Sequence, residues 1–198
     1  VKTVNSLMNH LNIKAYSVCG VSYGGLVTME LAVQQHEKID KVIVFDAPVK
    51  FIHPSDIVDV KSKFEVETIE ELFAPNGPKG LKKLMYLATM KKSIVPTSWL
   101  DELYENLYGN DLEEKRQLMT TLLKSMEDYK SHNYKLKMPV LLIWGSNDPV
   151  VPLRTGVLLN EHIGDNSNLV IIKNGAHMPN MTKTKKFDKA LKEFLEIN

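Results

Sequence analysis

The sequence has little cysteine, no long apolar run and no excess of charge of one sign. Its single cysteine, Cys19, cannot form a disulfide within the chain, which argues for a reducing compartment, so we expect a cytoplasmic protein. Because Cys19 ends an apolar run, it is expected to be a small buried side chain. No stretch approaches the roughly 18 apolar residues of a membrane-spanning helix, so none is expected. The chain has 25 lysine and arginine residues and 24 aspartate and glutamate residues. It therefore lacks the excess of positive charge that nucleic-acid binding needs, and we expect no nucleic-acid partner.

Signatures of metal and cofactor sites are also lacking. No group of His, Cys and Asp has metal-ligand spacing, and the glycine-rich stretch at residues 20–25 has no lysine of a phosphate-binding loop. We therefore expect neither a metal nor a cofactor. A basic run indicates the solvated face of a helix: Lys183, Lys185 and Lys186. Five histidines are assigned to the surface: His10, His36, His53, His132 and His162.

The sequence does contain strand-length apolar runs that alternate with helical periodicity. Four such runs stand at residues 13–20, 41–48, 139–145 and 169–174. They are apolar throughout rather than alternating, which is typical of a parallel sheet buried on both faces. A chain of 198 residues is long enough for one sizeable core. The pattern predicts an α/β fold with a mostly parallel sheet flanked by helices.

The middle of the chain has a different pattern. Residues 49–138 have no strong strand signal and read as a series of helices, so we expect a helical lid there, between core segments at residues 1–48 and 139–198. Loops at the carboxyl ends of parallel strands lie over the ligand crevice, which places such a lid over a pocket. Six apolar side chains could line that pocket, although each is more typical of helix packing: Met85, Met90, Trp99, Tyr104, Tyr108 and Met126.

Three residues of catalytic type follow predicted strands in the order Ser22, Asp148, His177. Because parallel strands end at the same edge of a sheet, we expect these side chains to share that edge. A Ser–His–acid relay requires this arrangement, since the imidazole takes the serine proton and the carboxylate fixes the imidazole. Asp46 also ends a strand and is an alternative acid, but the loop of Asp148 is preferred.

Ser22 lies in the pattern G-x-S-x-G, "GVSYG", directly after the first run. Alone, this pattern also suits a glycine-rich turn. On a sharp strand-to-helix turn, however, the residues two before and two after the serine come close together, so we expect Gly20 and Gly24 to avoid a clash. The backbone N–H of Tyr23, at the start of the next helix, would help to stabilise an oxyanion.

These segments together resemble the α/β-hydrolase superfamily along nearly the whole chain. "GVSYGG" is similar to its nucleophile elbow, "LLIWGSNDPVVP" to its acid loop, "NGAHMP" to its histidine loop and residues 49–138 to its lid. The sequence of these segments is most similar to a capped, esterase-like, plant-type branch of this superfamily. The resemblance implies that Ser22 is the nucleophile, Asp148 the acid, His177 the base and the Tyr23 N–H an oxyanion donor.

The sequence departs from the family at its start. Members have strands before the helix with which this chain opens, and a turn after their third strand supplies a second oxyanion N–H. We expect these strands to be lacking, which would leave the strand before Ser22 as an exposed edge.

The first functional hypothesis is a serine hydrolase that cleaves a carboxylic ester, or an amide, of a small apolar substrate through an acyl-enzyme on Ser22. Three alternatives stay open: a lyase with the same triad, a small-molecule receptor that turns over slowly or not at all, and an inactive truncated fragment. The sequence makes no prediction of the substrate's identity or of the oligomeric state.

Overall fold

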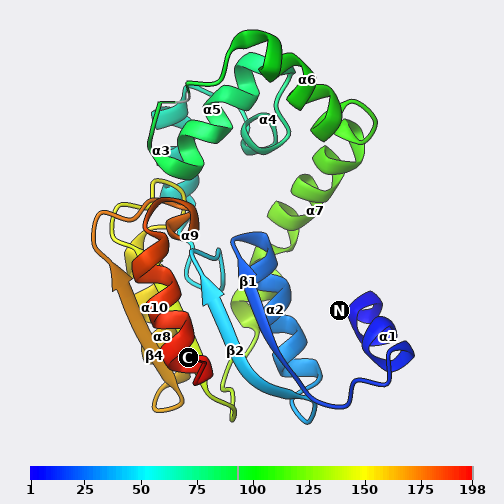
Figure 1. Cartoon of the computed structure of the whole chain (residues 1–198), viewed down its shortest axis with the longest axis vertical. Coiled ribbons are helices and arrows are strands. Elements are labelled where there is room, and N and C mark those ends of the chain that lie inside the picture. The colour runs from blue at the N-terminus through cyan, green and yellow to red at the C-terminus, as the bar shows by residue number, and fades with distance from the viewer. Residues whose placement is uncertain (93, 198) are drawn as a thin grey trace. The chain divides into compact units, whose positions relative to one another are not determined.

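The chain folds into two compact units. A computed structural model describes residues 1–92 and 94–197, and the side chains of all of these except 126, 127, 129 and 130. One unit comprises Val1–Ile52 and His132–Asn198, and the other comprises His53–Ser131. Figure 1 follows the chain through the sheet, the helical segment and back to the sheet.

The first unit contains a four-stranded parallel sheet. In the order in which they lie side by side, the strands are β1 (Tyr16–Val21), β2 (Ile39–Phe45), β3 (Val140–Gly145) and β4 (Ser167–Ile172). All three neighbouring pairs are parallel. Every residue of β3 is buried, as its continuous apolar run predicts. The parallel sheet expected from the sequence is confirmed.

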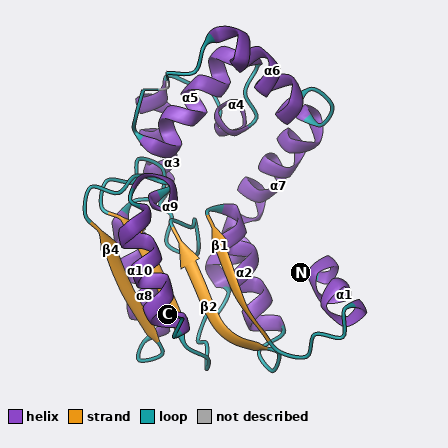
Figure 2. Ribbon diagram, viewed as in Figure 1, coloured by secondary structure: helices purple, strands orange, loops and turns teal. Residues whose placement is uncertain are grey.

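Helices cover both faces of this sheet (Figure 2). Helices α2 (Tyr23–Gln34) and α8 (Leu153–Ile163) lie on one face, where Gly25 lies against Val44 and Gly156 lies against Trp144. Helix α10 (Thr184–Leu195) covers the other face, because Phe187 packs into a cluster with residues of β2, β3 and β4. Alternate residues of the strands therefore supply two buried layers.

The β1 side of the sheet is more open than its centre. Strand β1 comes first in the sheet order and pairs with β2. Cys19 on β1 is exposed, so the expectation of a buried cysteine is wrong: its strand lies first in the sheet order, where an exposed edge was expected for the strand before Ser22. Helix α1 (Lys2–His10) is present as predicted, but none of its residues is buried. The short helix α9 (Pro179–Thr182) precedes α10.

The second unit is the helical region between β2 and β3. Its elements are α3 (Pro54–Phe64), α4 (Ile69–Phe73), α5 (Gly77–Thr89), α6 (Thr97–Tyr108) and α7 (Leu112–Ser131). Leu81, Leu100 and Tyr108 form its core, with Met85 and Tyr104 packed against them. These aromatic and sulfur side chains thus serve helix packing, whereas Trp99 is 67% exposed. The side chain of Met126 lies outside the described residues. Across the described helices, none is both long and apolar enough to cross a membrane.

Candidate active site

Ser22 occupies a strained turn between β1 and α2. Its backbone has φ 50° and ψ −123°, and it is the N-cap residue of α2. A non-glycine residue with positive φ costs conformational energy and persists only where its surroundings fix it. Here the Ser22 N–H donates to Phe45 O (3.1 Å), and the Ser22 carbonyl accepts from Gly25 N (2.9 Å). The turn is therefore held from both the sheet and the helix.

Of the two glycines expected to avoid a clash near Ser22, Gly20 has this role and Gly24 does not. A Cβ on Gly20 would overlap Gly24 O and Thr28 Oγ1, so Gly20 permits the close approach of β1 and α2. A Cβ on Gly24 would meet nothing within 4 Å, which makes the expected clash there wrong. The second close approach is at Gly25, where a Cβ would come within 2.5 Å of Ala47 Cβ. The difference arises because α2 turns its third residue, not its second, toward the sheet.

Helix α2 begins at the residue after Ser22, and its N-terminus carries unpaired donors. The first N–H groups of any helix have no carbonyl partner within the helix, and the helix dipole adds partial positive charge. The N–H of Tyr23 is the first of these in α2. A backbone donor at a helix N-terminus therefore follows Ser22 directly in the chain, and its role as an oxyanion donor stays a prediction.

Asp148 and His177 meet at the carboxyl ends of β3 and β4. The two side chains are joined by a hydrogen bond between His177 Nδ1 and Asp148 Oδ2 of 2.9 Å. The side chains are 4% and 0% exposed, respectively. Because a carboxylate only accepts, Nδ1 carries the proton in this bond and Nε2 is left as the basic nitrogen. Such a pairing fixes the tautomer that a general base needs.

The carboxylate of Asp148 is fixed by backbone donors as well. Its Oδ1 accepts from Val150 N (2.8 Å) and Val151 N (3.1 Å). With His177 on Oδ2, three donors hold the two oxygens, which stabilises the charged form and fixes the orientation of the carboxylate.

The loops that carry the acid and the histidine are tied to each other. The Asn147 N–H donates to Gly175 O (2.9 Å), and the Asn174 N–H donates to Ser146 Oγ (2.8 Å). Gly145 also has no room for a side chain, because a Cβ there would lie 2.7 Å from Gly175 O. The Asp148–His177 pair is thus supported by contacts between its own loops.

Asp46, the alternative acid, lies beside this pair. It is fully buried at the end of β2, and its Oδ1 accepts from Gly145 N (2.8 Å). Burial, followed by the charge of Asp148, raises the pKa of Asp46 to about 10, although the bond from Gly145 opposes this. The imidazole of His177 is hydrogen-bonded to Asp148 rather than to Asp46.

Ser22 shares an edge of the sheet with these groups. Val21 is level with Phe45, and Phe45 with Ile143, so the residues that follow β1, β2 and β3 emerge side by side. Neighbouring strands lie about 4.8 Å apart, which puts the ends of β1 and β3 about 10 Å apart. Among the described residues, Ser22 and His177 share no hydrogen bond; catalytic bonds of this kind often tighten only with substrate bound.

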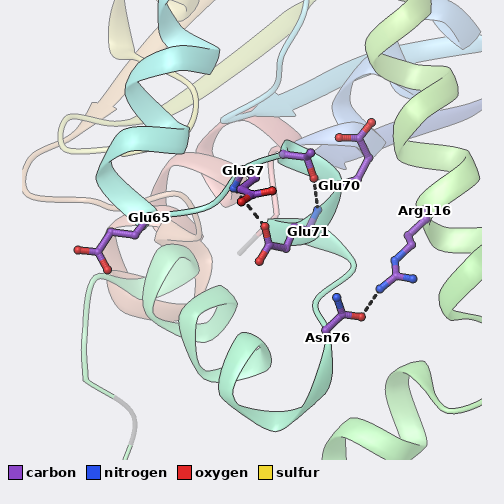
Figure 3. Close-up of a pocket in the computed structure, with 7 residues that line it drawn as sticks. Glu65, Glu67, Glu70, Glu71, Asn76 and Arg116 are labelled. Carbon is purple, nitrogen blue, oxygen red and sulfur yellow. Dashed lines mark hydrogen bonds between the residues drawn. The ribbon is translucent and has the colours of Figure 1, made fainter.

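A pocket lies within the helical unit. It is lined by Glu65, Glu67, Thr68, Glu70, Glu71, Asn76 and Arg116 (Figure 3). One of its acidic residues, Glu71, has a structural role: its N–H donates to Thr68 Oγ1 (3.0 Å), and its Oε2 accepts from the Glu67 N–H (3.1 Å). These bonds cap the start of α4. The part of the chain that the structure describes contains no cluster of side chains suited to a metal ion.

The sequence matches the profile of a known family, described as alpha/beta hydrolase fold, over residues 1–184. The chain belongs to the α/β-hydrolase family. This confirms the family resemblance and the fold class. The finer placement in an esterase-like, plant-type branch stays a prediction.

Relatives within the α/β-hydrolase family are hydrolases. The chain is 22% identical over 196 residues to a 2-hydroxy-6-oxononadienedioate/2-hydroxy-6-oxononatrienedioate hydrolase of Burkholderia vietnamiensis, covering 98% of this chain and 67% of that protein. It is 25% identical over 189 residues to a monoacylglycerol lipase of Bos taurus, covering 93% and 56%. A solved meta-cleavage product hydrolase from Pseudomonas fluorescens IP01 superposes with a TM-score of 0.77 at 18% identity, covering 98% and 69%. The chain therefore spans from about half to about two thirds of the length of these α/β-hydrolases.

One buried polar cluster of this α/β-hydrolase was missed by sequence reasoning. His132 Nδ1 and Glu30 Oε1 are 2.7 Å apart, and the hydroxyl of the fully buried Tyr134 donates to the same oxygen (2.5 Å). The surface assignment of His132 is therefore incomplete. Glu30 is the one charged residue in helix α2, which is otherwise apolar or uncharged. A lone acid in such a helix is the sequence signal that could have predicted a buried partner for it.

Proposed function

We propose that Ser22, His177 and Asp148 form the catalytic triad of a serine hydrolase that cleaves a carboxylic ester, or alternatively an amide, of a small apolar substrate. The observation that carries this proposal is the 2.9 Å hydrogen bond between two buried side chains, His177 and Asp148. A buried imidazole held through Nδ1 has its other nitrogen available as a base. The family relatives, which are hydrolases, support the reaction class.

The proposed reaction begins with attack of Ser22 Oγ on the substrate carbonyl carbon while His177 Nε2 takes the serine proton. The oxyanion that forms is stabilised by the Tyr23 N–H and the N-terminus of α2. The tetrahedral species collapses, the C–O bond to the leaving group breaks, and His177 gives its proton to the departing alcohol. Water, activated by His177, then hydrolyses the acyl-enzyme and regenerates Ser22.

Substrate selection is assigned to the helical unit. This insertion leaves the sheet from the carboxyl end of β2, and ligands of open α/β sheets bind outside the carboxyl ends of the strands. We propose that residues 49–138 act as the lid of this hydrolase.

A second candidate reaction is hydrolysis of a carbon–carbon bond next to a ketone. The relative from Burkholderia vietnamiensis is named for 2-hydroxy-6-oxo dienedioates, which carry such a ketone. The same serine and histidine would attack that carbonyl, and the leaving group would be a carbanion rather than an alcohol.

The first test is labelling of the full-length protein by a fluorophosphonate, which reacts with activated serines. We expect rapid labelling of the wild type and none of Ser22→Ala. Ser17→Ala, at an exposed position on the same strand, is the matched control and should label like the wild type. Labelling that survives in Ser22→Ala would exclude Ser22 as the nucleophile.

Turnover then separates the candidate functions. Aryl esters, anilides and a 2-hydroxy-6-oxo dienoate are offered to the same preparations. Release of alcohol over many turnovers supports the ester hydrolase, and preferential cleavage of the dienoate supports the second candidate. Thermal stabilisation by a ligand without turnover would instead identify a receptor.

A further inference from the structure

Asp46 is a buried acid that the proposed reaction does not use. It directly follows β2, is fully buried and has φ 47°, in the left-handed region that costs a non-glycine residue energy. Its N–H donates to Ile143 O (3.3 Å), and its Oδ1 accepts from Gly145 N (2.8 Å). Both contacts are with β3, at residues three and five positions before Asp148. The backbone of Asp46 is thus held in an unfavourable conformation that directs its carboxyl group to the start of the acid loop.

The second oxygen of Asp46, Oδ2, is buried and has no donor among the described residues. The charge of Asp148 and a side-chain hydrogen bond with it are two of the causes that raise the pKa of Asp46, which indicates that the two carboxyl groups lie close together. Two carboxylates in such contact cannot both be ionised at low cost, so a proton must lie between them. Only a proton on one of the two oxygens converts this contact into a hydrogen bond.

The donors around the two acids decide which of them carries the proton. Asp148 accepts from the backbone N–H groups of Val150 and Val151 and from His177 Nδ1. Among the described residues, the Asp46 carboxyl group accepts a hydrogen bond only from Gly145 N. Three donors stabilise a negative charge better than one, so the charge belongs on Asp148 and the proton on Asp46.

We propose that Asp46 is a positioning residue: a neutral carboxylic acid that donates a hydrogen bond to Asp148 and holds its carboxylate toward His177. This inference rests on the proposed triad. It also gives the pair a fixed net charge of −1, so that the imidazole of His177 faces one negative charge and not two. Asp46 and Asp148 have the same side chain, and their different roles arise from the different hydrogen-bond donors around them.

The electrostatics of the site agree with this assignment. Burial is the largest cause that raises the pKa of Asp46, to about 10, and the charge of Asp148 is the next. Asp148 is the titratable group whose charge acts on Asp46, and Asp148 is in turn hydrogen-bonded to His177. The acid is therefore protonated throughout the range in which a histidine base operates.

The protonation state can be observed directly, without activity. At about pH 8, where free carboxylic acids are ionised, infrared spectra of the full-length protein should contain the carbonyl stretch of a protonated, buried acid. We expect Asp46→Asn to lose this band. Asp40→Asn, at an exposed position on the same strand, should retain it. A wild-type spectrum without the band, or a band that survives in Asp46→Asn, would overturn the proposal.

The positioning role is tested by comparing Asp46→Ala with Asp46→Asn. The alanine variant has no donor to Asp148. We expect fluorophosphonate to label it at least about tenfold more slowly than the wild type, the size of effect seen when residues that orient metal ligands by hydrogen bonds are removed. The asparagine variant keeps a neutral donor and should restore most of that rate, with the wild-type pH midpoint. If Asp46 were ionised, removing its charge would shift the midpoint of Asp46→Asn to lower pH, which would overturn the proposal. If the wild type does not label at all, the triad fails, and the infrared band alone still decides the state of Asp46.

Discussion

Tyr134 donates its hydroxyl proton to Glu30 Oε1 at 2.5 Å, and this bond joins α2 to the segment before β3 across 104 positions of the chain. Tyr134 is fully buried, and Glu30 is 9% exposed. His132 contacts the same oxygen at 2.7 Å, so two side chains from the segment that returns to the sheet converge on one acid of α2. Helix α2 is the helix that begins beside Ser22, which connects this cluster to the geometry of the elbow.

Tyr134→Phe should destabilise the protein by about 1–3 kcal/mol, because it leaves a buried acid without one of its donors. Urea unfolding measures this change. The matched control is Tyr16→Phe, since the buried hydroxyl of Tyr16 has no partner among the described residues, and its removal should cost little. Equal losses in the two variants would show that the bond to Glu30 contributes nothing specific.

Asp148→Asn should slow fluorophosphonate labelling by roughly 10³- to 10⁴-fold, because an amide holds the imidazole of His177 in the wrong tautomer. Folding should be retained, since the side chain keeps its shape. Asp165→Asn, at an exposed turn position, is the control and should label normally. A rate close to the wild type in Asp148→Asn would mean that another acid serves His177, and Asp46 would be the first to test.

Gly20→Ala should destabilise the protein by about 1–3 kcal/mol or more, because the added methyl group overlaps Gly24 O and Thr28 Oγ1. Gly24→Ala is the paired variant. Position 24 lies in a helix with open space around it, so alanine should be neutral or stabilise by up to about 1 kcal/mol. Chemical denaturation of both variants decides the matter. The reverse order of stabilities would mean that the elbow has a different backbone.

The stability of the protein should depend on the ionisation of Asp46. Its pKa is raised in the folded state to about 10, above the ordinary value of 3.8, so between these values the folded state binds a proton that the unfolded state has lost. Below this window the group has no effect. Within it, the contribution of Asp46 lowers stability by about 1.4 kcal/mol for each unit by which pH rises.

Asp46→Asn removes that dependence, so its stability relative to the wild type should increase as pH rises. Urea unfolding at about pH 5, 7 and 9 measures the difference between the two proteins. Asp40→Asn, at an exposed position of the same strand, should show no such trend. A difference that stays constant with pH would show that Asp46 is ionised in the folded state.

The strands were predictable because their burial appears directly in the sequence. Strand β3 and residues 42–45 of β2 are buried on both faces, and these segments are apolar without interruption. The contact between Asp148 and His177, and the place of Ser22 at the same edge of the sheet, were predictable from their order after parallel strands, because parallel strands end at one edge. Neither prediction needed any knowledge of how the helices pack.

What escaped the sequence depends on distances between segments far apart in the chain. The close approach at Gly25 rather than Gly24 follows from the direction in which α2 leaves the elbow. The contact of Asp46 with Asp148 spans two loops, and the exposure of Cys19 follows from the place of β1 in the sheet. A periodic pattern shows which face of an element is buried, but not which residue on another element lies against it.

The bonds between the acid and histidine loops limit how the triad can move. Because Asn147 is bonded to Gly175 and Ser146 to Asn174, a displacement of Asp148 carries His177 with it. The elbow is anchored separately, by Ser22 N–H to Phe45 O. In the proposed triad, the separation of Ser22 Oγ from His177 Nε2 is therefore the length that these bonds do not fix, and we expect a bound substrate to set it.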